Sequence, residues 1–233
     1  MIWASCRRSI GGSVLFGSLR WSGSSLLDVK DRHVCILVHG SKNTRGQLEK
    51  LYREIANRYG TTFDVFLAFE WPGGITPLAY LGTSLLSVGR AADYLTEVIE
   101  TCYKHGARSV TVDAHSLGVP IALEAALQSA WGVDGLLLKA GAMPRDLSKY
   151  RPLVEAVPAA AVDVFFSKYD PIVKWLYRLW WPFRGALGCY GESTNGGNIA
   201  TQWNCESEKA RHGDYRHSSA VAQAAVNNRN RRL

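Results

Sequence analysis

Short apolar runs and segments of helical periodicity alternate along the chain. Residues 34–38 form a continuous apolar run, which is typical of a strand buried on both faces of a sheet. Residues 46–59 follow with helical spacing. The apolar positions that this spacing places on one face are Leu48, Leu51, Ile55 and Ala56. The pattern predicts a strand followed by a helix that packs on it.

The same alternation continues as far as residue 227. The further strands that we expect cover 63–69, 109–114, 134–139, 160–166 and 200–205. The further helices that we expect cover 84–105, 117–130, 171–180 and 217–227. Strands that alternate with helices predict the α/β class, with a mainly parallel central sheet flanked by helices.

Two short strands are also predicted at the start of the chain. Residues 1–6 and 13–21 flank Gly11 and Gly12, and this arrangement indicates a short antiparallel hairpin. The same segment contains arginines and serines but no acid, which also weakly resembles an organelle transit segment. We favour the hairpin.

The composition fits a globular protein. The chain has 233 residues, of which 47% are hydrophobic and 20% are charged, so we expect one domain over 1–228 and a basic tail over 229–233. No apolar run approaches the roughly 18 residues of a membrane-spanning helix. Five cysteines without a C-x-x-C pair indicate neither a disulfide framework nor a zinc site. They suit a reducing compartment, and we expect a cytoplasmic location.

The formal net charge of +7 is concentrated at the two ends. Residues 1–27 and 229–233 hold six arginines and no acid, which leaves only +1 on residues 28–228. Proteins that bind nucleic acid concentrate basic residues on a face of the fold. We therefore expect no nucleic-acid partner.

A candidate nucleophile lies where a predicted strand meets a predicted helix. Residues 114–118 read Ala-His-Ser-Leu-Gly, close to the G-x-S-x-G turn that exposes a serine at the edge of an α/β sheet. Ala114 replaces the first glycine of that pattern, and Ser116 is the serine. A plain helix cap is the other interpretation of Ser116.

A candidate oxyanion hole follows the strand at 34–38. Acyl transfer needs two backbone N–H donors at the developing oxyanion. One is expected from Leu117, directly after the nucleophile, and the other from Ser41 in the His-Gly-Ser sequence at 39–41. An ordinary glycine turn at a strand end is the alternative.

A candidate acid follows the strand at 160–166. Asp170 precedes Pro171 and can both cap the helix at 171–180 and orient a catalytic histidine. The competing position, after the strand at 134–139, offers no acid until Asp146.

Two histidines are candidates for the catalytic base. His212 and His217 both lie between the last predicted strand and the last predicted helix. We favour His212, because Gly213 leaves it unencumbered and Tyr215 can pack beneath its loop. His217 is the alternative base, and it reads more like the start of the final helix. The resulting chain order is serine, acid, histidine.

These residues resemble the α/β-hydrolase superfamily, and more narrowly a group of uncharacterised bacterial serine hydrolases. The segments that carry the resemblance are Val-His-Gly at 38–40, Phe-Glu-Trp-Pro-Gly at 69–73 with Tyr80 downstream, 114–118, and Ser-Lys-Tyr-Asp at 167–170. The resemblance spans about residues 33–217. It implies a serine-hydrolase fold with a triad of Ser116, Asp170 and a C-terminal histidine, and it implies no particular substrate.

The expected function is hydrolysis of a carboxylic ester or a related acyl bond in a small substrate. Ser116 attacks, His212 transfers the proton and Asp170 orients His212. This chemistry requires no metal and no organic cofactor. Esterase, lipase and thioesterase activities share these residues, and a catalytically silent binding protein of the same fold is the alternative.

Two further segments lie close to the predicted site. Residues 171–183 are rich in aromatic and basic side chains; we expect a helix whose tryptophans belong to the core, and an acyl pocket, a small cap or an interfacial helix is the alternative. Residues 184–200 are rich in glycine and asparagine, and we expect a mobile loop there.

Overall fold

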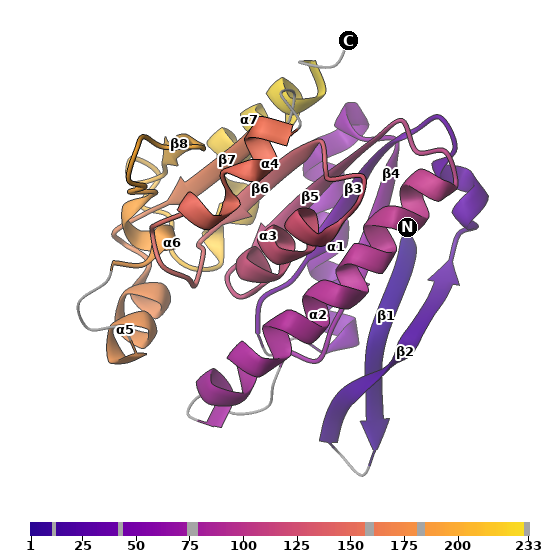
Figure 1. The fold of residues 1–233 in the computed structure, drawn as a ribbon, viewed down its shortest axis with the longest axis horizontal. Helices are drawn as coiled ribbons and strands as arrows, with labels where there is room; N and C mark the ends of the chain where they lie inside the picture. Colours follow the sequence, from indigo (N-terminus) through magenta and orange to yellow (C-terminus); the bar gives the residue numbers. More distant parts are fainter. Residues whose placement is uncertain (11–12, 42–43, 74–78, 157–160, 181–184, 231–233) are drawn as a thin grey trace.

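The computed structural model describes residues 1–10, 13–41, 44–73, 79–156, 161–180 and 185–230. Eight strands form one sheet with the order β2-β1-β4-β3-β5-β6-β7-β8 (Figure 1). The strands are β1 Ile2–Ile10, β2 Ser13–Gly23, β3 His33–Val38, β4 Val65–Glu70, β5 Ser109–His115, β6 Gly135–Lys139, β7 Ala161–Phe166 and β8 Thr201–Asn204. All neighbours are parallel except β1 and β2, which confirms the predicted fold class.

Helices cover both faces of the sheet (Figure 1). Helices α1 Arg45–Tyr59 and α7 Ser219–Asn230 pack on one face, and α2 Ala79–Lys104 and α3 Gly118–Gln128 pack on the other. The shorter helices are α4 Pro152–Ala156, α5 Pro171–Trp180 and α6 Leu187–Tyr190, with 3-10 turns η1 Leu26–Val29, η2 Gly60–Thr62, η3 Ser148–Tyr150 and η4 Asp214–His217.

The N-terminal hairpin is confirmed, and it is part of the main sheet. β1 pairs antiparallel with β2 and also parallel with β4, with Ile2 opposite Leu67 and Ser5 opposite Glu70. Ile2 and Ala4 are buried in the core. Gly11 and Gly12, which we expected at the turn, lie outside the described residues.

Strand β3 divides its side chains between two layers of core. Val34, Ile36 and Val38 pack toward α2 and α3, whereas Cys35 and Leu37 pack toward α1 and α7. The strand is buried on both faces, as its apolar run predicts. The carboxyl ends of β3 and β5 lie side by side, because Val38 pairs with Ala114.

The structure extends two predicted helices. α2 begins at Ala79 rather than at residue 84, and α7 continues through Asn230. Residues 229 and 230 are therefore helical, although we expected them in the tail, and the guanidinium of Arg229 donates to the carbonyl of Thr61. Buried Asn228 donates to Asp163 (2.9 Å), which fixes this end of α7 on the sheet.

Two predictions near the site were wrong. Trp175 is 64% exposed, so it does not belong to the core, and Trp180, Trp181 and Phe183 lie outside the residues with described side chains. The segment 185–200 is not simply a loop, because it contains α6. The buried carboxylate of Glu192 accepts hydrogen bonds from the backbone N–H groups of Ile199 and Ala200. These bonds hold the last residues of the segment in place.

No helix within the described residues is both long and apolar enough to cross a membrane.

The contact between α3 and β3 predicts a large effect of one methyl group. A Cβ on Gly118 would lie 2.7 Å from the carbonyl oxygen of Val38, so Gly118→Ala should destabilise the protein by about 1–3 kcal/mol through overpacking. Gly89→Ala is the matched control, because Gly89 also lies in a helix and nothing surrounds its Cβ position within 4 Å. The control should stabilise by about 0.5–1 kcal/mol. Urea unfolding measures both, and equal effects would contradict the contact.

Candidate active site

Ser116 lies on a strained turn between β5 and α3. Its φ of 57° is in the left-handed region, which is costly for a residue with a side chain and is typical of a nucleophile elbow. The turn is held from β6, because Ser116 N–H donates to the carbonyl of Lys139 (2.9 Å). The carbonyl of Ser116 in turn accepts from the N–H of Ala142 (3.2 Å) and of Val119 (3.1 Å).

Glycines allow the loop after β3 to touch this turn. A Cβ on Gly40 would lie 2.8 Å from the Cβ of Ser116 and 3.3 Å from its Oγ. Gly118 meets the same stretch of chain from the other side, with the carbonyl of His39 2.8 Å from its Cβ position. Both positions therefore require glycine, and the two loops that carry the predicted chemistry are in direct contact.

The predicted oxyanion donors flank this contact. Leu117 is the N-cap residue of α3, and no described residue accepts a hydrogen bond from its N–H. Ser41 follows Gly40 and lines the cavity beside it. Leu117 thus follows Ser116 within the turn, and Ser41 follows the glycine that lies against Ser116.

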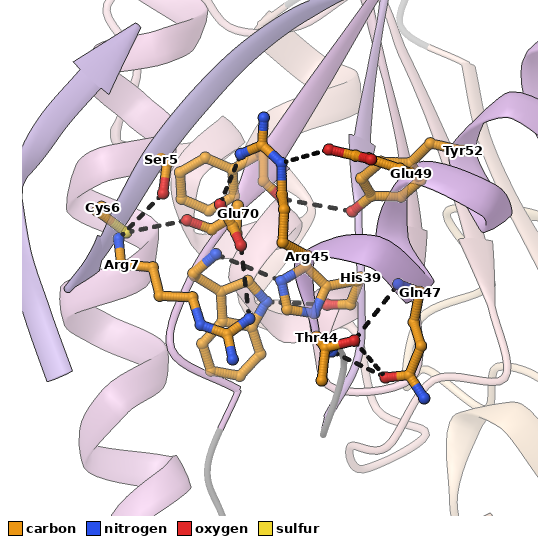
Figure 2. A network of polar contacts seen from close by, with 12 residues as sticks. Ser5, Cys6, Arg7, His39, Thr44, Arg45, Gln47, Glu49, Tyr52 and Glu70 are labelled. Atoms are coloured by element: carbon orange, nitrogen blue, oxygen red, sulfur yellow. Dashed lines mark hydrogen bonds and ion pairs between the residues drawn. The ribbon is translucent and has the colours of Figure 1, made fainter. Parts of the chain in front are cut away.

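His39 fixes the loop after β3 to the end of β4 (Figure 2). Its Nδ1 contacts the carbonyl of Gly40 (2.6 Å), so Nδ1 carries the proton and Nε2 accepts from the backbone N–H of Trp71 (3.3 Å). The indole N–H of Trp71 donates to the carbonyl of His39 (2.9 Å), and the two rings stack at 5.5 Å. Burial lowers the pKa of His39 to about 4, so its imidazole is neutral at pH 7.

Glu70 anchors the start of α1 next to this loop. Its buried carboxylate pairs with Arg45 (2.8 Å), the first residue of α1, and with Arg7 of β1 (3.5 Å), as Figure 2 shows. The guanidinium of Arg45 lies 3.4 Å from the centroid of the Trp3 ring. A capping box of Thr44 and Gln47 begins the helix. The two ends of the loop, at His39 and at Arg45, are therefore each held by buried or partly buried contacts.

Asp170 and His212 form a hydrogen-bonded pair at the same edge of the sheet. Asp170 follows β7 and is fully buried, and its Oδ2 lies 2.8 Å from Nδ1 of His212. Its Oδ1 accepts from the N–H groups of Ile172 (3.1 Å) and Val173 (3.0 Å) in the first turn of α5. The carboxylate thus caps α5 and orients His212 at the same time.

The structure separates the two candidate bases. His212 contacts Asp170, whereas Nε2 of His217 accepts from Nε of Arg216 (2.9 Å) in the exposed turn η4. Tyr215 is buried beneath the loop, as its position suggests, and its hydroxyl donates to the carbonyl of Gly188 (3.3 Å). The geometry therefore favours His212 over His217.

His115 is a member of the site that sequence reasoning missed. Its Nε2 donates to the backbone carbonyl of His212 (2.6 Å), and the two rings lie 4.7 Å apart. Burial, together with the nearby His212, lowers the pKa of His115 well below its ordinary value. His115 therefore links the Ser116 turn directly to the loop that carries His212, and its place before Ser116 was the available signal.

The hydroxyl of Ser116 makes no hydrogen bond to His212 or to any other described residue. Catalytic hydrogen bonds often shorten only when substrate is bound. A cavity of about 300 Å³ lies beside Ser116 and is lined by Ser41, His115 and His212, among others. The cavity therefore offers space next to the candidate base and Ser41, beside the glycine that lies against Ser116.

No protein-family model matches this chain, and no curated protein matches it in sequence. Among solved structures, it is similar to a predicted CIB-like hydrolase from Thermoplasma acidophilum, with 14% identity, a TM-score of 0.51 and coverage of 96% of both chains. This likeness shows a shared fold.

Two weaker similarities are to the product of gene lin2722 from Listeria innocua and to an uncharacterized protein from Bacillus cereus. The first has 14% identity, a TM-score of 0.47 and coverage of 83% of this chain and 92% of that one. The second has 16% identity, a TM-score of 0.49 and coverage of 89% of this chain and 60% of that one.

The buried, neutral His39 predicts a loss of stability in weak acid. Below its ordinary pKa of 6.5 the unfolded imidazole binds a proton, whereas the folded one does not until the pH nears 4. As the pH falls through this window, the contribution of His39 should lower the free energy of unfolding by up to about 1.4 kcal/mol per pH unit. Urea unfolding at pH 7, 6 and 5 measures the slope, and His39→Gln should reduce it.

His105→Gln is the control for this slope, because His105 lies at the exposed end of α2. It should leave the pH dependence unchanged. A slope that is the same in wild type and in His39→Gln would contradict the account of His39.

Proposed function

We propose that this protein is a serine hydrolase that cleaves a carboxylic ester or a related acyl bond through an acyl-enzyme intermediate. The observation that carries the proposal is the hydrogen bond between buried Asp170 and His212. It lies at the sheet edge where Ser116 occupies a strained turn. Acid, base and serine reach this edge from three separate segments in the order typical of α/β hydrolases. The fold shared with a predicted hydrolase is consistent with this function.

In the proposed reaction, Oγ of Ser116 attacks the carbonyl carbon while Nε2 of His212 takes its proton. Asp170 accepts from Nδ1–H of His212 and stabilises the imidazolium that forms. The N–H groups of Leu117 and Ser41 hold the oxyanion. His212 then protonates the leaving group, which departs. His212 next deprotonates a water molecule that attacks the acyl carbon, and it returns this proton to Oγ of Ser116 as the carboxylic acid is released.

The contacts around His39 support the oxyanion part of this proposal. Oxyanion donors are effective when they are held in place before the reaction. Trp71 binds both the side chain and the carbonyl of His39, and Glu70 holds Arg45 on the other side of the loop. The residue before Gly40 and Ser41 is thus fixed by Trp71, which supports an oxyanion donor at Ser41.

A catalytically silent binding protein of the same fold is the second candidate. The observation that favours it is the hydroxyl of Ser116, which is not hydrogen-bonded to His212. Turnover separates the two functions, because a binding protein retains ligand without releasing product.

Covalent labelling tests the nucleophile. A fluorophosphonate probe should label the wild-type protein, and Ser116→Ala should abolish both the label and the hydrolysis of short p-nitrophenyl esters. Removal of a catalytic serine typically lowers kcat by several orders of magnitude. Equal labelling of wild type and Ser116→Ala would refute the proposed nucleophile.

A matched pair of histidine variants tests the base. His212→Ala should lower kcat by at least about 1000-fold because the proton acceptor is lost. His217→Ala should change kcat by less than about threefold, because His217 contacts Arg216 and not Asp170. Steady-state kinetics with p-nitrophenyl acetate measures both, and the reverse ranking would assign the base to His217.

A further inference from the structure

The cavity beside Ser116 continues inward between α1 and the sheet. Ser41 and His212 line it, and Gly40, which also lines it, lies directly against the side chain of Ser116. A group attached to the carbonyl that Ser116 attacks would extend into this space. The volume of about 300 Å³ corresponds to about ten non-hydrogen atoms, at roughly 30 Å³ for each water-sized group.

The lining of the cavity combines apolar and charged side chains. The walls are apolar and include Leu37, Leu51, Ile55 and Ile172. Two charged side chains, Asp113 of β5 and Lys139 of β6, also line the cavity, and each is at most 3% exposed. Both residues lie within strands that are otherwise buried and mainly apolar. Buried charges of this kind need partners.

Neither charged group has all of its possible hydrogen bonds among the described residues. The carboxylate of Asp113 forms an ion pair with the ammonium of Lys139, and its Oδ2 accepts from the hydroxyl of Tyr59 (2.6 Å). Apart from the ion pair, Oδ1 of Asp113 makes no hydrogen bond to a described residue. An ammonium has three donors, and among the described residues Lys139 forms an ion pair with Asp113 alone. At least one N–H of Lys139 is therefore available to a molecule in the cavity.

We propose that this cavity binds the acyl group of the substrate and that Lys139 selects acyl groups whose far end carries a hydrogen-bond acceptor. The inference rests on the serine hydrolase function proposed above. Apolar walls favour a methylene chain, and an acceptor at its end forms a charge-assisted hydrogen bond with Lys139. A plain alkyl end displaces water from the ammonium but forms no hydrogen bond in its place, which lowers the affinity for that substrate.

Two esters that differ only at the far end test this selectivity. The kcat/KM of the wild-type protein should be at least about tenfold higher for p-nitrophenyl 5-oxohexanoate than for p-nitrophenyl hexanoate, because the keto oxygen bonds to a charged donor. Equal values, or a preference for hexanoate, would overturn the inference.

A double variant assigns the preference to Lys139. Asp113→Asn combined with Lys139→Met removes both charges together, so neither is left buried without its partner. The double variant should have about the same kcat/KM for the keto ester as for the hexanoate ester. Lys149→Met is the matched control, because Lys149 pairs with Glu124 in an exposed position away from the cavity. It should retain the wild-type ratio, and a double variant that also retains it would contradict the role of Lys139.

A second variant covers the case in which the double variant does not fold. Leu51→Trp fills the cavity from the half-buried side of α1. It should lower kcat/KM for both hexanoyl esters by at least about tenfold more than for p-nitrophenyl acetate. An unchanged ratio would show that the acyl group binds elsewhere.

The outcomes also separate this inference from the function on which it rests. Acetate turnover that depends on Ser116, without any keto-ester preference, would overturn the inference alone. Absence of any turnover that depends on Ser116 would overturn the proposed function, and the acyl specificity would be lost with it.

Discussion

The close approach of two backbone segments determines how the rest of the site is built. The chain that leaves β3 passes so near to the turn after β5 that neither Gly40 nor Gly118 has room for a Cβ. The same turn holds Ser116 at a positive φ, and β6 fixes it through the hydrogen bond to Lys139. Strain of this kind persists only where the surrounding contacts impose it. Here the two glycines and the β6 carbonyl supply those contacts.

Further contacts spread from this point to the neighbouring strands. On one side, Trp71 at the end of β4 binds His39, and Glu70 holds the start of α1. On the other side, His115 holds the carbonyl of His212, whose ring is oriented by Asp170 after β7. Residues at the ends of β3, β4, β5, β6 and β7 thus form one connected set of contacts, and each proposed catalytic group belongs to it.

Much of this arrangement follows from sequence patterns. Apolar runs and helical spacing predict the strands and the main helices, because burial on two faces or on one face produces those patterns directly. The positions of Ser116, Asp170 and His212 follow from one rule, that the loops after parallel strands meet at the same edge of the sheet. The sequence does not decide between His212 and His217, because that choice depends on the path of the η4 loop.

Other features depend on side-chain directions that no pattern reveals. The link from His115 to His212 requires the strained turn, whose geometry becomes visible only in three dimensions. The exposure of Trp175 depends on how α5 is placed after its cap, and the helix α6 depends on contacts with the β6 loop. The sequence does contain a signal for Asp113 and Lys139, because each is a charged residue within a strand that is buried. Such residues are candidates for a paired or functional role.

The central claim is that Ser116 forms a covalent acyl intermediate, and mass spectrometry of the reacting protein tests it most directly. The wild-type protein is mixed with a slowly hydrolysed ester, quenched in acid within the first turnovers and digested. The account predicts one added acyl group per chain, located on the peptide that contains Ser116 and absent after Ser116→Ala. Turnover without an adduct, or an adduct on another residue, would contradict it.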